Sequence, residues 1–206
     1  MRQKLNVEDW NRKEHFKFFK TFDQPYYGVT VTLDCTHAYP QAKTFGVSFY
    51  SYYLHKILIA VNETENFKYR IDGDDVYICD RVDASSTILR DDHTFGFSHI
   101  IFKHDLLDFH QEVTREIQRV KSTSGLFTTD PLSNVIHFSA LPWVNFTSIS
   151  EAFNKSANDS CPKISVGKMT DVEGHKQMPL AIQVHHALVD GYHLGLFLDK
   201  LQLLLN

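Results

Sequence analysis

The amino-acid sequence predicts one α/β domain, residues 1–206, in which a mixed β-sheet is flanked by helices. Two observations support this fold class. Stretches with the apolar spacing of a helix face alternate along the chain with stretches in which every second residue is apolar, as in a half-buried strand. Several predicted strands also follow one another with no helix between them, an order typical of a sheet that helices cover.

The first half of the chain predicts two helices, one strand and a hairpin. Phenylalanines recur at helical spacing in residues 11–22, whereas apolar and polar residues alternate in residues 27–35. Residues 48–62 carry a strong, largely apolar helical pattern. Residues 67–79 place an Asp-Gly turn between two short β-rich runs, which predicts a hairpin.

The second half predicts further strands and two more helices. The strands are expected near residues 95–102, 134–141, 163–169 and 178–186. The helices are expected across residues 106–121 and from about Gly191 onward. No internal repeat or long linker divides the chain, and 206 residues with 43% hydrophobic content are enough for one sizeable core.

Composition argues against several classes of partner. The net charge is −4 and the basic residues are scattered, so we expect no nucleic-acid partner. No run approaches the roughly 20 apolar residues of a membrane span, and the first residues lack a secretory-type apolar stretch, so we expect a cytoplasmic protein without a membrane partner. Three cysteines, Cys35, Cys79 and Cys161, fit neither a disulfide framework nor a metal clip and are expected as reduced thiols in or near the core.

The stretch "VHHALVDGYH", residues 184–193, holds three histidines and one aspartate. A metal site, a structural turn and a catalytic base held by a carboxylate are the three possible interpretations. Neighbouring side chains on a strand point to opposite faces, so His185 and His186 are poorly placed to share an ion. A site made of His186, Asp190 and His193 lacks a recognisable zinc spacing, and we therefore expect no metal.

The remaining interpretations both place a turn after the last strand. If the strand ends near His186, Asp190 can fold back beneath the turn, with Gly191 giving the backbone the freedom it needs. Histidine has an ordinary pKa of about 6.5 and can accept a proton at neutral pH, so an ordered His186 is a candidate general base. From the residues alone, a core histidine beside a turn-forming aspartate is the favoured interpretation, and the catalytic base is the alternative.

Three blocks of sequence carry a resemblance to a known family. They are "WNRKEHFKFF" at residues 10–19, "FSALPWVNF" at residues 138–146, and the pattern HHxxxDG at residues 185–191. Together they resemble the chloramphenicol acetyltransferase family of the CoA-dependent acyltransferase superfamily. The resemblance implies a two-layer sandwich and acetyl transfer from acetyl-CoA to a hydroxyl of chloramphenicol or a related small molecule. Acetyl-CoA would be a co-substrate, and no cofactor would be bound permanently.

The resemblance also implies a role for individual residues. His186 would be the general base, Asp190 would pair with Arg12 to hold its loop, and Ser139 would donate a hydrogen bond to the oxyanion of the tetrahedral intermediate. The residues implied at the CoA site are Ser165, Lys168, Tyr50 and Trp143, the last expected as a buried aromatic. Those implied at the acceptor site are Phe19, Thr94 and Phe95. His185 and His193 are expected to be structural.

The family also implies a homotrimer, in which His186 of one subunit faces Ser139 of the next. Some residues depart from the family's pattern: Phe19 replaces a common tyrosine, and Ser150 and Glu151 are polar where the family usually has apolar pocket residues. The catalytic residues are therefore retained while the acceptor pocket is altered. A catalytically weak homologue that binds an amphiphilic small molecule in the same pocket is the alternative.

Overall fold

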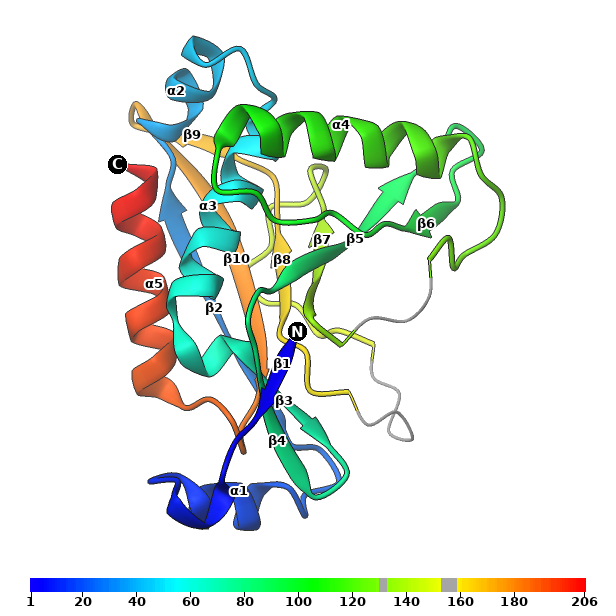
Figure 1. Cartoon of the computed structure of the whole chain (residues 1–206). Coiled ribbons are helices and arrows are strands. Elements are labelled where there is room, and N and C mark those ends of the chain that lie inside the picture. The colour runs from blue at the N-terminus through cyan, green and yellow to red at the C-terminus, as the bar shows by residue number, and fades with distance from the viewer. Residues whose placement is uncertain (130–132, 153–158) are drawn as a thin grey trace.

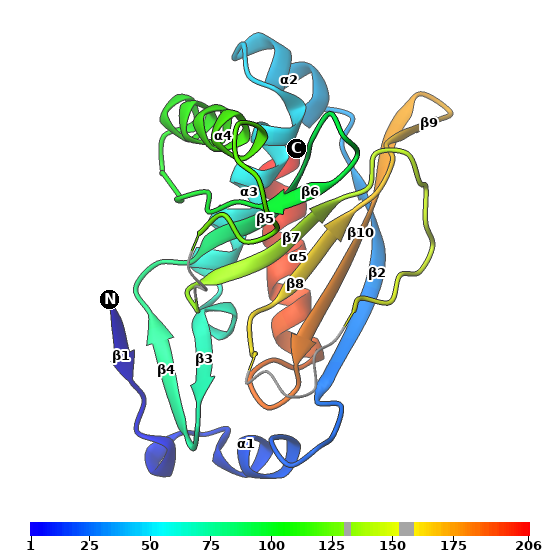
Figure 2. The same cartoon turned by 90° about the vertical axis from the view of Figure 1, so that its right-hand side faces the viewer.

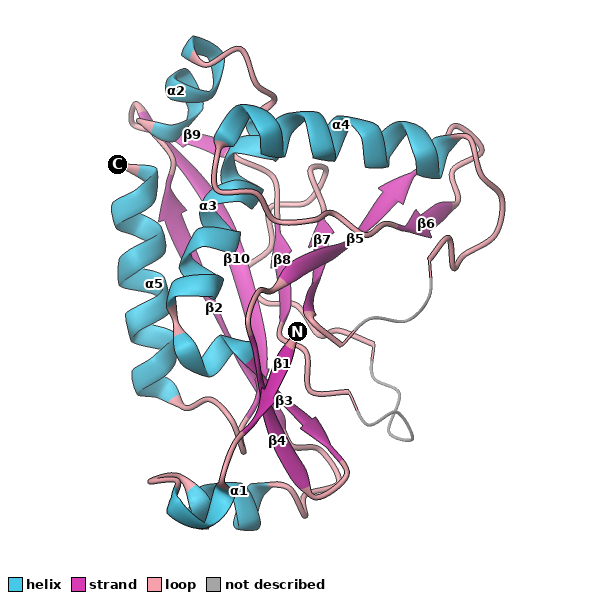
Figure 3. Cartoon of the chain, viewed as in Figure 1, coloured by secondary structure: helices cyan, strands magenta, loops and turns pink. Residues whose placement is uncertain are grey.

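The computed structural model describes residues 1–129, 133–152 and 159–206. Its centre is a seven-stranded sheet in the order β2-β10-β8-β7-β5-β6, with β9 paired to β10 (Figures 1 and 2). A smaller sheet in the order β1-β4-β3 lies below it in Figure 1, next to α1. The predicted α/β class, a mixed sheet flanked by helices, is confirmed (Figure 3).

The strands of the central sheet are β2 (Tyr26–Asp34), β5 (Asp83–Leu89), β6 (Phe95–Phe97), β7 (Val135–Ala140), β8 (Lys163–Val166), β9 (Thr170–Val172) and β10 (His175–His185). The small sheet consists of β1 (Arg2–Lys4), β3 (Tyr69–Asp72) and β4 (Asp75–Cys79). The helices are α1 (Lys13–Phe19), α2 (Ala38–Thr44), α3 (Phe49–Glu63), α4 (Leu106–Lys121) and α5 (Gly191–Leu205), with short 3-10 turns at Val7–Asp9 and Glu65–Lys68.

The central sheet is mixed because β7 runs parallel to both of its neighbours, β5 and β8, while the other pairs are antiparallel. The longest ladder joins β10 to β2, from Gln177 opposite Asp34 to His185 opposite Tyr26. This ladder ends at the stretch of three histidines. The backbone just beyond it is therefore anchored on the most extensive pairing in the sheet.

Helices α3 and α5 cover one face of the central sheet, and no helix among the described residues lies on the other face (Figures 1 and 2). The core lies between these two layers, where the rings of Phe67 and Phe197 stack with centroids 4.5 Å apart. On β7, Phe138 points toward α3 and contacts Tyr50 and Tyr53. Because side chains alternate along a strand, Ser139 points to the face without helices.

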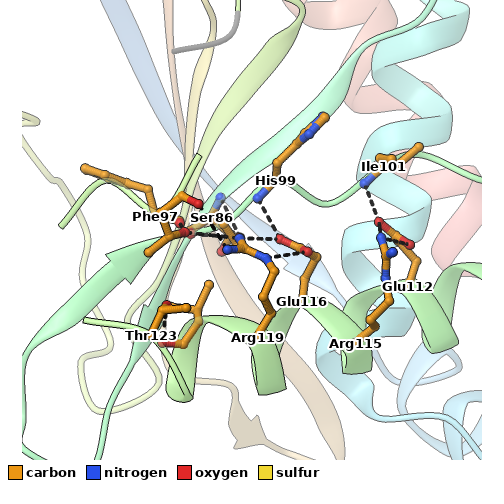
Figure 4. Close-up of polar contacts among 12 residues, drawn as sticks. Ser86, Phe97, His99, Ile101, Glu112, Arg115, Glu116, Arg119 and Thr123 are labelled. Atoms are coloured by element: carbon orange, nitrogen blue, oxygen red, sulfur yellow. Dashed lines mark hydrogen bonds and ion pairs between the residues drawn. The ribbon is translucent and has the colours of Figure 1, made fainter. Parts of the chain in front are cut away.

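Helix α4 holds the far edge of the sheet with two buried carboxylates (Figure 4). Glu116 accepts the backbone N–H of His99 at 3.0 Å, and Glu112 accepts that of Ile101 at 3.3 Å. Each carboxylate is also paired with an arginine one turn further along α4. These contacts fix the segment that follows β6.

Most predicted elements are confirmed, and four were missed. Helix α4 has the predicted bounds, and the hairpin of β3 and β4 forms as expected. The strand expected near residues 95–102 is limited to β6. The central strand β5, the short strands β1 and β9 and the short helix α2 were not predicted. All three cysteines are free and buried, as expected. No helix in the described ranges is long and apolar enough to cross a bilayer.

Candidate active site

The turn that carries His186 begins where β10 ends. His185 is the last residue of the strand, and the N–H of His186 donates to the carbonyl of Pro25 at 2.8 Å. The N–H groups of Leu188 and Val189 then donate back to the carbonyl of His185. These bonds satisfy the backbone of the turn and fix where the His186 side chain leaves it.

The His186 imidazole lies between two aromatic rings. It stacks on Phe19 of α1 with ring centroids 3.9 Å apart and an interplanar angle of 12°, and its centroid is 4.3 Å from that of Tyr27 of β2. The side chain is half-buried, and its Nδ1 atom is fully buried without a hydrogen-bond partner among the described residues. Nε2 is therefore the nitrogen that a substrate can reach.

The predicted ion pair between Arg12 and Asp190 is present. Arg12 Nη1 donates to Asp190 Oδ2, and Arg12 Nη2 reaches the carbonyl oxygen of His186 at 3.4 Å. Burial alone would raise the pKa of Asp190, but the Arg12 guanidinium holds that pKa below its ordinary value. One arginine thus joins the carboxylate beneath the turn to the backbone of the histidine.

Asp190 also begins the last helix. Its carboxylate accepts the N–H of Tyr192 at 3.1 Å, and His193 Nδ1 accepts the N–H of Asp190 at 3.2 Å, which completes a capping box at the start of α5. His193 therefore has a structural contact, in line with expectation. The aspartate ties together the turn, the helix and the arginine.

His185 points away from His186, to a buried site beside Tyr26. Burial lowers the pKa of His185 to about 4, so its ring is neutral at ordinary pH. Its Nδ1 accepts the N–H of Ala187 at 3.3 Å. These contacts support the structural role expected for His185.

Tyr27 is a neighbour of His186 that sequence reasoning missed. Its hydroxyl is buried and has no hydrogen-bond partner among the described residues. Burial raises the pKa of this phenol to about 12, so it keeps its proton. The alternation of β2 placed Tyr27 on a strand face, but only the β2–β10 register, which sets it opposite Val184, brings it to His186.

A second group of predicted site residues lies elsewhere on the sheet. Ser139 of β7 is opposite Ser165 of β8, and the Ser165 hydroxyl is hydrogen-bonded to the carboxylate of Glu151. The Tyr50 hydroxyl lies 2.7 Å from Ser86 Oγ, and burial raises the pKa of Tyr50 to about 12. Ser139 and Ser165 lie on one face of the sheet, whereas Tyr50 lies on the other face, because its partner Ser86 is opposite Phe138 in the β5–β7 ladder.

The remaining residues predicted for the CoA and acceptor sites are exposed in this chain. Trp143 was expected to be buried, and that expectation is wrong: its side chain is 70% exposed, because it lies in the loop after β7 rather than in the core. Lys168 is exposed just after β8. Thr94 and Phe95 lie at β6, the edge strand, where Thr94 Oγ1 donates to Asp92 Oδ1 at 2.7 Å.

The two groups do not meet within one chain. Ser139 is opposite Ser165, which is opposite Ala181 on β10, and His186 lies five residues further along. Two strand spacings of about 4.8 Å and five residues of about 3.3 Å put the two backbones roughly 19 Å apart. A hydrogen bond from Ser139 to anything held by His186 of the same chain is therefore excluded by distance.

Three metal-ligand types among the described residues gather on the His185 side of the turn, not around His186: Tyr26, whose ring contacts His185, donates its hydroxyl to the carbonyls of Asp159 and Cys161. Potential ligand atoms of His137, Asp159 and Cys161 lie within 4.8 Å of one another. The Asp159 carboxylate is also paired with Lys163, a cation that competes for the same oxygen. Sequence reasoning did not foresee this cluster, because its members come together only through the pairing of β7 with β8.

Comparisons with known proteins agree with the sequence resemblance. A family model described as chloramphenicol acetyltransferase matches residues 2–202. A chloramphenicol acetyltransferase of Proteus mirabilis is 31% identical over 96% of this chain and 92% of its own length. The chloramphenicol acetyltransferase 3 of Escherichia coli is 29% identical over 98% of this chain and 96% of its own.

Solved structures extend the comparison to the fold. A chloramphenicol acetyltransferase structure superposes with a TM-score of 0.93 and 33% identity, covering all of both chains. A probable dihydrolipoamide acetyltransferase from Listeria monocytogenes superposes with a TM-score of 0.68 over 93% of this chain and 88% of its own. Its identity is 14%, so it shows a shared fold and nothing further.

Proposed function

This chain belongs to the chloramphenicol acetyltransferase family and is an acetyltransferase of that type, and we propose that it uses His186 as a general base to acetylate a hydroxyl of chloramphenicol or a related small molecule. The observation that carries the proposal is the turn of His186, whose carbonyl and whose Asp190 carboxylate are both held by Arg12. A histidine held in this way is oriented before the substrate arrives, which is where positioned bases gain most of their effect.

The chemistry follows from a proton acceptor at Nε2. The acceptor hydroxyl attacks the thioester carbonyl of acetyl-CoA while His186 Nε2 takes the hydroxyl proton. The negative charge that develops on the carbonyl oxygen receives a hydrogen bond from the Ser139 hydroxyl. Collapse of the tetrahedral intermediate then expels the CoA thiolate, which regains the proton from the imidazolium. Because a thioester is already activated, no covalent enzyme intermediate, metal or permanently bound cofactor is needed.

The active enzyme in this proposal is a homotrimer of a single-domain chain, residues 1–206. The separation of roughly 19 Å between Ser139 and His186 supports it, because a second copy must supply the missing half of the site. His186 of one subunit would face Ser139 of the next.

The two substrates would reach this site from opposite sides. The CoA side would be lined by Ser165, Lys168, Tyr50 and Trp143, and the acceptor side by Phe19, Thr94 and Phe95. An exposed Trp143 fits a surface that another subunit or CoA covers. Because its co-substrate would be acetyl-CoA, we expect the enzyme in the cytoplasm.

The test is release of free CoA thiol from acetyl-CoA in the presence of chloramphenicol. The wild-type enzyme should release thiol only when both substrates are present. His186→Ala should lower turnover by about 10²–10⁴-fold. His15→Ala, which removes an exposed histidine of α1, is the matched control and should keep full activity. Binding of chloramphenicol without thiol release would instead favour the weak homologue that only binds.

A further inference from the structure

Glu151 places a carboxylate beside the proposed oxyanion site. Its Oε1 accepts a hydrogen bond from the hydroxyl of Ser165, a residue that is 2% exposed. Ser165 is opposite Ser139 in the parallel ladder of β7 and β8, so both side chains point to the same face of the sheet, the one opposite α3 and α5. One strand spacing and one hydrogen bond separate the carboxylate from the Ser139 hydroxyl, a distance of roughly 8 Å.

The described residues do not neutralise this carboxylate. None of their ion pairs includes Glu151, and none of their hydrogen bonds reaches its Oε2 atom. Lys163, the nearest cation along β8, is paired with Asp159. Glu151 therefore brings a negative charge to a site where the reaction itself develops a second one.

This charge would oppose catalysis with a neutral acceptor. Two unit charges roughly 8 Å apart at an effective dielectric constant of about 20 repel enough to slow a reaction by roughly 30-fold. The repulsion disappears if the acceptor carries a positive charge that sits against the carboxylate. A cation at this point compensates Glu151 and at the same time orients the acceptor hydroxyl.

We propose that the acceptor is a hydroxylated small molecule that also carries a protonated amine, and that Glu151 binds the amine. The proposal rests on the proposed acetyltransferase function and names the class of acceptor for that same site. Ser165 holds Oε1, so Oε2 is left to accept from the ammonium group. The transfer itself is unchanged: the hydroxyl is acetylated, and the ammonium, which has no lone pair while protonated, is not.

A matched pair of acceptors tests this assignment. The first is chloramphenicol, whose nitrogen is a neutral amide. The second is the same nitrophenyl diol with a dimethylamino group in place of that amide, which is protonated at neutral pH and cannot be N-acetylated to a neutral amide. Wild-type kcat/KM should favour the ammonium compound by at least about 10-fold. Glu151→Gln should lower kcat/KM for it by about 10–100-fold and raise kcat/KM for chloramphenicol by up to about 30-fold, because the repulsion is removed.

Controls separate specificity from folding. Glu63→Gln, which neutralises an exposed carboxylate at the end of α3, should change neither value. Unchanged melting of Glu151→Gln would show that the substitution leaves the fold intact. If wild type prefers chloramphenicol, or if Glu151→Gln alters both acceptors equally, the proposal is overturned.

Failure of the proposed function has a different signature. In that case neither acceptor would give thiol release. Calorimetric measurement of the binding of the ammonium compound then tests whether Glu151 holds the ammonium group. Binding at least about 10-fold tighter to wild type than to Glu151→Gln would still support the role of Glu151. Equal binding to the two proteins would refute it.

Discussion

Asp190→Asn tests the link between Arg12 and the turn of His186. Asparagine is as good a helix N-cap as aspartate, so the start of α5 should keep its cap. What the substitution removes is the charge that pairs with Arg12. The Arg12 side chain is 9% exposed and the Asp190 side chain 30%, so the pair lies between the fully buried and the surface case.

The magnitude follows from that burial. Removing one partner of a fully buried pair costs about 3–5 kcal/mol, whereas exposed pairs contribute about 0–1 kcal/mol. We therefore expect Asp190→Asn to lower the free energy of unfolding by about 2 kcal/mol, which for a domain of this size lowers Tm by about 4–8 °C. Because the folded-state pKa of Asp190 is lowered, its contribution is present above its ordinary pKa and is lost as pH falls.

The assay is urea unfolding of Asp190→Asn, Arg12→Met and the double variant, with thiol release measured on each. The two sites should couple by about 2 kcal/mol in the double-variant cycle, since both changes break one pair. Asp74→Asn removes a fully exposed partner of Lys20 and should be indistinguishable from wild type. Additive effects of the two substitutions, or an intact turnover in Asp190→Asn, would refute the reasoning.

Three further predictions concern neighbouring groups. His186→Ala should preserve Tm and lose about 10²–10⁴-fold in turnover, whereas His185→Ala should cost about 2 kcal/mol and keep most activity; the opposite pattern would contradict the assigned roles. Burial alone would lower the pKa of His137, but its bonds to Asp159 and a neighbouring thiol raise that pKa to about 9. Protonated His137 therefore stabilises the fold fully below pH 6.5, and this stabilisation is lost as pH rises through 9. Because the His137 side chain is 42% exposed, we expect this stabilisation to be about 1 kcal/mol after solvent screening. His137→Gln should therefore make the free energy of unfolding less dependent on pH between about pH 7 and 10, and an unchanged dependence would contradict the role of His137. Glu116→Gln should cost about 2 kcal/mol in thermal unfolding, because a buried carboxylate that accepts a backbone N–H loses its charge, and a change below about 0.5 kcal/mol would be inconsistent with the contacts of α4.

The elements that the sequence predicted are those whose pattern is local. The apolar stripe of α4 and its Asp105 cap are readable within one stretch of chain, and its bounds were predicted correctly. Strand β5 was missed because Asp83 and Ser86 are buried polar residues, satisfied by partners such as His99 and Tyr50 that only the fold supplies. Helix α2 is seven residues long and contains Pro40, which weakens any helical signal.

In the candidate site, too, the sequence predicted the local features and missed the contacts that only the fold supplies. His186 and Asp190 lie in one short stretch, so alternation and turn chemistry could place the histidine beside the carboxylate. Arg12 is 178 residues from Asp190, and only the family resemblance pointed to it. The contact of Tyr27 with His186 and that of Glu151 with Ser165 depend on strand register and on a loop path, which no local pattern encodes.

Mixing two inactive variants tests whether the site lies between copies of the chain. Within one chain Ser139 and His186 are roughly 19 Å apart, so the proposed site would take its histidine and its serine from different subunits. Ser139→Ala and His186→Ala should each lose at least about 10²-fold in activity. In randomly mixed trimers, a site is intact when its histidine comes from a Ser139→Ala chain and its serine from a His186→Ala chain, which happens in about one quarter of the sites of a closed ring. Co-refolding the two variants in equal amounts should therefore restore about 25% of wild-type thiol release, while combining them without dissociation should restore none. If each chain held a complete site, every site in the mixture would still carry one defect, and no activity would return.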